Sequence, residues 1–162
     1  MAFPAIGLPE KNIQTKAEVE EIYFFSEALA FTLPQEEKVK AWLIDIARAN
    51  DQRLSLLNYI FCSDDYLLQI NQEYLQHDDY TDIITFDQTE PSGPIEGDIF
   101  ISVERVRENA LTWQSPFETE LRRVIAHGLL HLLGFGDKTE TEAAQMRQKE
   151  EQCLMHWNKL PD

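Results

Sequence analysis

Four short apolar runs, each bounded by turn-forming or charged residues, predict the strands of a small sheet. They span residues 22–25, 53–62, 83–86 and 97–101. The second run alternates closely enough between apolar and polar positions to predict a strand with one buried face. The third run is short and β-branched between charged flanks, which is typical of a sheet edge. Proline and glycine at 90–94 separate the last two runs and favour a long-looped hairpin.

Helices are predicted where apolar residues recur every three or four positions. Ser63, Ser102 and Thr139 precede three of these segments as side-chain caps. Ser115 and Glu118 flank Pro116 as a capping box, so we expect them to define the start of a further helix. The predicted helices cover approximately residues 35–49, 64–74, 103–113, 116–133 and 140–156. This order of elements predicts an α+β fold, a sheet of about four strands packed with helices.

The composition is that of a chain long enough to bury a core. Its 162 residues are 43% hydrophobic, so we expect a single domain, with a core domain at 22–157 and a surface arm or frayed end at 1–16. Apolar runs fall well short of the ~20 residues of a membrane span. The first residues lack a signal-peptide pattern, so a cytoplasmic location is expected. Cys62 and Cys153 are widely separated and are predicted to be buried thiols.

The segment from His127 to Asp137, HGLLHLLGFGD, carries the pattern of a metal site. Histidines four residues apart lie on one face of a helix, so His127 and His131 can reach the same ion. Gly134 is suited to end this helix, and the following turn can return Asp137 to both rings. Two nitrogens and one carboxylate leave a coordination position open, as in catalytic zinc sites. We predict one Zn²⁺ per chain; the competing interpretation is two structural histidines, with Asp137 capping the turn.

The same spacing matches the metzincin peptidase signature H-E-x-x-H-x-x-G-x-x-H except at two positions. Gly128 replaces the catalytic glutamate, and Asp137 replaces the third histidine. Glu120 lies on the histidine side of the helix but two turns, roughly 10 Å, before His127, which is too far for direct action. A zinc metallopeptidase is therefore an alternative only if its base comes from elsewhere in the chain.

Segments beyond the metal helix make the chain similar to the bacterial YbeY family of rRNA-maturation endoribonucleases. Residues 127–134 resemble the family motif H-G-x-L-H-L-x-G. Residues 71–86 resemble N-x-x-Y-R-x-x-D-x-x-T-[ND]-V-L-S-F, and residues 97–102 resemble G-D-I-x-I-S. The similarity covers roughly residues 54–153 in the family's order. It implies an α+β fold around a metal cleft, with Thr81 and Asp82 in that cleft.

Two departures from the family pattern bear on the site. Asp137 stands where the family usually has a third histidine, and Leu75 stands where it has an arginine. A guanidinium is a natural phosphate partner, so the phosphate-binding residue is left open. Four arginines could form a basic patch or could equally pair with the abundant carboxylates: Arg105, Arg107, Arg122 and Arg123.

The resemblance implies a hydrolase, a metal-dependent endoribonuclease that cuts an RNA phosphodiester with a metal-activated water. Its implied work is 16S rRNA 3′ end processing and ribosome quality control. RNA and the ribosome or its proteins are the implied partners, and neither DNA nor a membrane is expected. The net charge of -15 argues against a general basic nucleic-acid binder, so RNA contact needs local cations, the metal or a partner. No side chain is assigned as catalytic base. A non-catalytic ribosome-associated factor with a structural metal is the other alternative.

Overall fold

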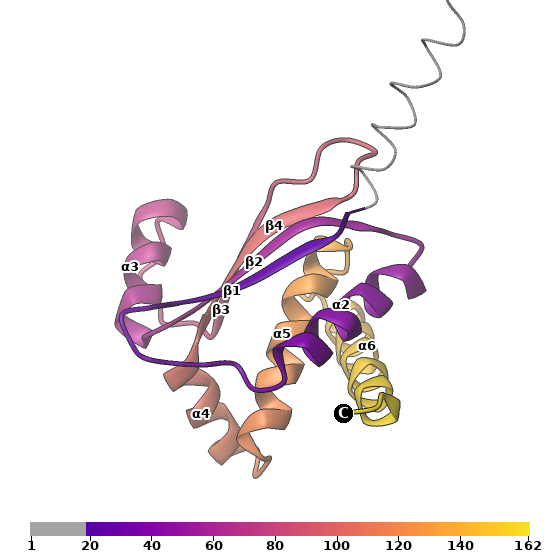
Figure 1. Cartoon of the computed structure of the whole chain (residues 1–162). Coiled ribbons are helices and arrows are strands. Elements are labelled where there is room, and N and C mark those ends of the chain that lie inside the picture. The colour runs from indigo at the N-terminus through magenta and orange to yellow at the C-terminus, as the bar shows by residue number, and fades with distance from the viewer. Residues whose placement is uncertain (1–18) are drawn as a thin grey trace, which may run out of the picture.

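The computed structural model describes residues 19–162, and the predicted arm at 1–16 lies outside this range (Figure 1). The strands in this range are β1 (Glu21–Glu27), β2 (Leu54–Cys62), β3 (Ile83–Asp87) and β4 (Ile95–Ser102). The helices in this range are α2 (Glu36–Ala49), α3 (Asp64–Leu75), α4 (Val103–Thr112), α5 (Phe117–Leu132) and α6 (Glu140–Lys159). Every predicted element is present, and the largest difference is the end of α6, which continues from 156 to Lys159.

The strands form one mixed sheet in the order β1-β2-β4-β3. β1 and β2 are parallel, as are β2 and β4, whereas β3 runs antiparallel to β4. The predicted hairpin and the predicted edge strand at 83–86 are therefore both confirmed. β3 leaves one side of its backbone without a strand partner in the described part of the chain, and α5 packs next to β3.

Helices cover both faces of the sheet, with α2, α5 and α6 on one face and α3 on the other (Figure 1). The strands supply both layers because successive side chains point to opposite faces. In β4, Ile99 and Ile101 are fully buried in the main core, whereas Phe100 packs with the smaller cluster under α3. Burial of each such aliphatic side chain contributes roughly 1.5–3 kcal/mol. Cys62 and Cys153 are free and buried, as predicted.

Most helix starts follow the predicted caps. The hydroxyls of Ser63 and Ser102 accept hydrogen bonds from backbone N–H groups in the first turns of α3 and α4. Thr139 and Glu142 form the predicted capping box of α6. Within residues 19–162, no helix combines the length and apolar character needed to cross a bilayer.

The predicted capping box at the start of α5 is wrong. Pro116 itself occupies the N-cap position, with φ −58° and ψ 143°, and no side chain caps the helix. Because α5 thus begins one residue later than the Ser115 cap requires, Glu118 sits at the wrong position to complete the box. Its carboxylate instead lies 3.9 Å from Arg122 on the next turn.

Candidate metal centre

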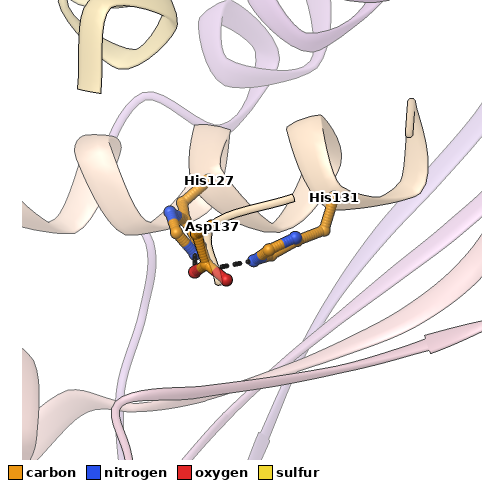
Figure 2. Close-up of side chains that lie close together, drawn as sticks. All are labelled: His127, His131 and Asp137. Carbon is orange, nitrogen blue, oxygen red and sulfur yellow. Dashed lines mark ion pairs between the residues drawn. The ribbon is translucent and has the colours of Figure 1, made fainter. Parts of the chain in front are cut away.

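Three side chains converge where α5 passes beside the edge strand β3. His127 and His131 extend from α5, and the loop after the helix brings Asp137 between them (Figure 2). Asp137 Oδ2 lies 3.4 Å from His127 Nε2 and 3.3 Å from His131 Nε2. One ligand atom from each residue lies within 4.8 Å of the other two. The structure thus brings together all three residues predicted to bind a metal.

The sequence of the turn explains how the carboxylate returns to the rings. α5 ends at Leu132, and Gly134 adopts a positive φ of 105°, which a residue with a side chain rarely does. The backbone N–H of Phe135 donates to Leu130 O, which closes the turn against the last turn of the helix. Asp137 therefore reaches back across one turn of α5.

The other nitrogen of each ring is occupied by the protein. His131 Nδ1 donates to the carbonyl oxygen of Phe135 at 2.9 Å, and since a carbonyl only accepts, the neutral ring keeps its lone pair on Nε2. His127 Nδ1 lies 2.6 Å from Glu150 Oε2 on α6. A carboxylate or carbonyl behind a histidine is the usual arrangement at protein metal sites, because it fixes the tautomer and the ring orientation.

The distances from Asp137 to the two histidines fit a single ion, and the two ring nitrogens lie within 4.8 Å of each other. Tetrahedral ligands about 2.0–2.1 Å from a zinc ion lie roughly 3.3–3.4 Å from one another. The two measured nitrogen-to-oxygen distances, 3.4 and 3.3 Å, match this spacing. Imidazole and carboxylate together suit Zn²⁺ and other first-row transition metals.

Glu150 is a site residue that sequence reasoning missed. Its side chain is 9% exposed, and it also lies 3.6 Å from Arg123. The available signal was a glutamate at the spacing of the buried residues Met146 and Cys153 along α6. Helical spacing shows that such a residue faces inward, but it does not show that the residue meets His127 on another helix.

The carboxylates around His127 raise its pKa. Burial lowers the pKa of His127, but the hydrogen bond with Glu150 and the charges of Glu150, Asp137 and Asp82 outweigh this, so the pKa is raised overall. Burial raises the pKa of the Asp82 carboxyl, against the opposing effect of His127. The acidic neighbours thus more than offset the free-energy cost of burying a protonated imidazole.

Gly128, the residue after His127, explains why α5 lies so close to the sheet. A Cβ atom at this position would lie 2.9 Å from Ile99 Cγ2 and 3.0 Å from Ile83 Cδ1. Any side chain here would push α5 away from β3 and β4, because cores are already close-packed. A metzincin glutamate at this position therefore has no space, and the peptidase alternative lacks its usual base.

A cleft of about 700 Å³ opens in front of the three ligand atoms, along β3 and the loop before it. Thr81 and Asp82 line it, as the resemblance implied. Leu75, which replaces the family's arginine, also lines this cleft, as does Lys138. Within residues 19–162, Lys138 makes no ion pair, so its charge is available in the cleft.

Three of the four arginines considered for a basic patch are paired with carboxylates. Arg105 lies 2.7 Å from Asp64, Arg122 lies 3.9 Å from Glu118, and Arg123 lies 2.7 Å from Glu151. Arg107 instead lies over the ring of Phe117 at 4.9 Å. Arg123 further contacts Glu120, which is therefore a buried ion-pair partner in the structure. The pairing interpretation is the one that the structure supports.

The mixed sheet and its helices define an α+β protein. Its candidate metal site consists of two histidines on a helix and a carboxylate from the following loop, beside the edge strand. Comparison then gives the family. Residues 14–158 match the family model described as Endoribonuclease YbeY, and the chain belongs to this family.

Individual relatives agree with the family match. Endoribonuclease YbeY of Cytophaga hutchinsonii is 53% identical over 135 residues, which cover 83% of this chain and 94% of that protein. Endoribonuclease YbeY of Christiangramia forsetii is 47% identical over 134 residues, covering 83% and 92%. The solution structure of TM1509 from Thermotoga maritima matches with a TM-score of 0.56 and 27% identity, covering 86% of this chain and 93% of that one. The predicted α+β fold is thus confirmed.

Proposed function

We propose that this protein is a metal-dependent endoribonuclease that hydrolyses phosphodiester bonds of ribosomal RNA. The observation that carries the proposal is the convergence of His127, His131 and Asp137 at a cleft, in a chain 53% identical to an Endoribonuclease YbeY. Maturation of the 16S rRNA 3′ end and ribosome quality control are the proposed tasks, with RNA and the ribosome as partners. Such work would be done in the cytoplasm.

The proposed ligands are the Nε2 atoms of both histidines and a carboxylate oxygen of Asp137, with Zn²⁺ as the proposed ion. When bound, such an ion would lower the pKa of a coordinated water and neutralise charge on the phosphoryl oxygens. Glu150 and the Phe135 carbonyl hold the two rings so that both Nε2 atoms face Asp137. The chain therefore supplies a pre-oriented ligand set, which costs little reorganisation on binding.

Substrate binding falls to the residues of the cleft wall. Because Leu75 cannot pair with a phosphate, Lys138 is the nearest replacement, as it lines the same cleft and follows the ligand Asp137. The unpaired side of β3 lines the cleft as well, and its backbone groups can hydrogen-bond to an extended substrate. These features suit a single strand better than a duplex.

The two alternatives are less well supported. A metallopeptidase has no room for a glutamate at Gly128, and a purely structural metal would not need an open 700 Å³ cleft at its ligands. The test is a pair of assays on metal-loaded protein, with single-stranded RNA and with casein. We expect RNA cleavage that a chelator stops and that His127→Ala reduces to background, and no casein hydrolysis. Chelator-sensitive casein hydrolysis without RNA cleavage would reverse the assignment.

A further inference from the structure

A second groove, besides the main cleft, also reaches the candidate metal centre. A hollow of about 270 Å³ is lined by His127 and Asp137 at one end and by Trp113 and Arg147 at the other. A smaller hollow of about 170 Å³ continues from it, and both include Trp113, Glu120, Arg123 and Arg147. We call the two hollows together the Trp113 groove. It connects directly with the proposed ligands.

Trp113 is unlike the other tryptophans of the chain. Trp42 and Trp157 are buried and pack edge to face in the core, with ring centroids 5.4 Å apart. Trp113 follows the last turn of α4 and is 67% exposed. A large aromatic side chain left open beside a polar groove is unusual, because its burial would be favourable.

Arg147 is the cation that remains available in this groove. Arg123 is surrounded by Glu120, Glu150 and Glu151, at 3.5, 3.6 and 2.7 Å, so its charge is already compensated. Arg147 extends from α6, is exposed, and forms no ion pair with any residue from 19 to 162. Its guanidinium therefore has no carboxylate partner within 4 Å among these residues, in a chain whose net charge is -15.

We propose that the Trp113 groove is a binding subsite for single-stranded RNA, in which a base stacks on Trp113 and the backbone phosphate pairs with Arg147. This inference rests on the proposed function. An aromatic face beside a free guanidinium is the combination that binds single strands, because every base has a π face and every nucleotide carries a phosphate. The strand would pass from the main cleft, across the ligand residues, into this groove.

Charge and continuity favour RNA over a protein as the occupant. The carboxylates Glu120 and Glu150 that line the groove are each 7% exposed and are both within ion-pair distance of Arg123. In the smaller hollow, the exposed charge that an incoming ligand meets is thus that of Arg147. The larger hollow also has the carboxylates of Asp82 and Asp137, and Asp137 is a proposed metal ligand. Leu111, two residues before Trp113, is 80% exposed. A protein-docking patch would include it, but it lines neither hollow.

The test measures binding of a short 2′-O-methyl oligouridylate, shown by gel to stay uncut, to the metal-loaded full chain. Trp113 is the one tryptophan exposed to the ligand, so stacking is expected to quench the intrinsic tryptophan fluorescence. Anisotropy of a labelled oligonucleotide over a range of salt concentrations gives the affinity and its salt dependence. Cleavable RNA gives KM and kcat separately.

Trp113→Ala should weaken oligonucleotide binding about five-fold or more, since loss of one stacked base has an effect of that size, and Trp113→Phe should retain most of the affinity. Arg147→Ala should weaken binding and reduce the slope of log affinity against log salt by about 0.7, whereas Arg147→Lys should keep the slope. Both alanine variants should raise KM with little change in kcat. Leu111→Ala and Arg53→Ala remove an exposed apolar residue and an exposed arginine outside the groove, and should bind as the wild type does.

The outcomes separate the subsite from the enzymatic function. If wild-type protein cuts RNA but Trp113→Ala and Arg147→Ala bind and cut it normally, the subsite is wrong and the nuclease assignment stands. That outcome is expected if Leu111 and Trp113 form a protein-docking surface. If the wild type neither binds nor cuts RNA, both proposals are overturned. Equal weakening by Arg53→Ala would reduce the Arg147 effect to overall charge and would also overturn the subsite.

Discussion

The two ring nitrogens of His127 have different partners. Nε2 faces Asp137 at 3.4 Å, and Nδ1 meets the buried Glu150 at 2.6 Å. Arg123 lies 3.6 Å from the same glutamate, so the imidazole is linked to a half-buried guanidinium through one carboxylate. Loss of Asp137 and loss of Glu150 are therefore expected to affect metal binding for different reasons.

Asp137 is expected to be required for metal binding. Asp137→Ala should lose most of the bound metal, because only two ligands from one helix remain. Asp137→His should retain it, because the imidazole restores a third ligand. Elemental analysis of desalted protein measures both. If the alanine variant holds one ion per chain and only unfolds more easily, Asp137 caps the turn and is not a ligand.

Glu150 is expected to act through the orientation of His127. Glu150→Gln should weaken metal affinity by about 10–100-fold, which is the usual cost of losing the acidic partner of a ligand histidine. Glu151→Gln is the matched control, because Glu151 pairs with the same Arg123 but does not contact His127. A competition titration with a chromogenic chelator gives both affinities. Equal weakening in the two variants would assign the effect to Arg123 and not to the histidine.

Side chains that converge within one helix and its following turn were predictable from the sequence, whereas contacts between separate elements were not. The pair His127 and His131 and the return of Asp137 depend on one helix and one turn, so spacing alone predicts their convergence. Glu150 is 23 residues from His127, and their contact depends on how α5 and α6 pack. The sequence predicts Trp113 only as the last residue of a helix, because the groove beside it is formed by residues of α4, α5 and α6 together.

At the scale of elements, the position of α5 against the sheet decides where the site can form. Gly128 on α5 contacts the side chains of β3 and β4, and Gly97 on β4 allows Leu132 of α5 to approach. These two close approaches place the histidine side of the helix at the edge strand. The cleft then forms between the rings and the loop that precedes β3.

Gly128→Ala tests this close packing. The added methyl group would lie 2.9 Å from a stiff branch of Ile99, and overpacking typically costs about 1–3 kcal/mol. The better helix propensity of alanine returns up to about 1 kcal/mol, so we expect a net loss of ~1 kcal/mol in the free energy of unfolding.

Thr119→Ala on the first turn of α5 is the control, and it should change stability by less than ~0.5 kcal/mol. Urea denaturation of the two variants and the wild type gives the comparison. A Gly128→Ala protein more stable than the wild type would show that α5 has space above the sheet.

Caps show which helix boundaries are readable from sequence. Ser63, Ser102 and Thr139 act within three residues of themselves, and each was predicted correctly. The start of α5 was not, because the backbone of Pro116 takes the N-cap position and displaces the expected Ser115 box. The local sequence allows either Ser115 or Pro116 as the N-cap, and the rest of the fold decides between them.

At the scale of the whole molecule, a strongly acidic protein has two cations near its candidate metal site that form no ion pair with the described residues. Lys138 lines the main cleft and Arg147 lines the Trp113 groove, and His127 and Asp137 line both. Long-range repulsion between RNA and a net charge of -15 is expected to slow association, so local contacts must hold the strand. The strands and the edge position of β3 were predictable from apolar runs, but the strand order and the placement of these cations required the assembled fold.

The most direct test of the account is a metal titration of RNA cleavage by metal-stripped protein. The substrate is an RNA that carries an immature 16S 3′ end, and the initial rate is followed as Zn²⁺ is added. Because His127, His131 and Asp137 form a single ligand set in the described residues, we expect the rate to rise from background and to saturate at one equivalent per chain. The His127→Ala/His131→Ala protein should stay at background throughout. Cleavage by the stripped wild type, or equal activation of the double variant, would contradict the central claim.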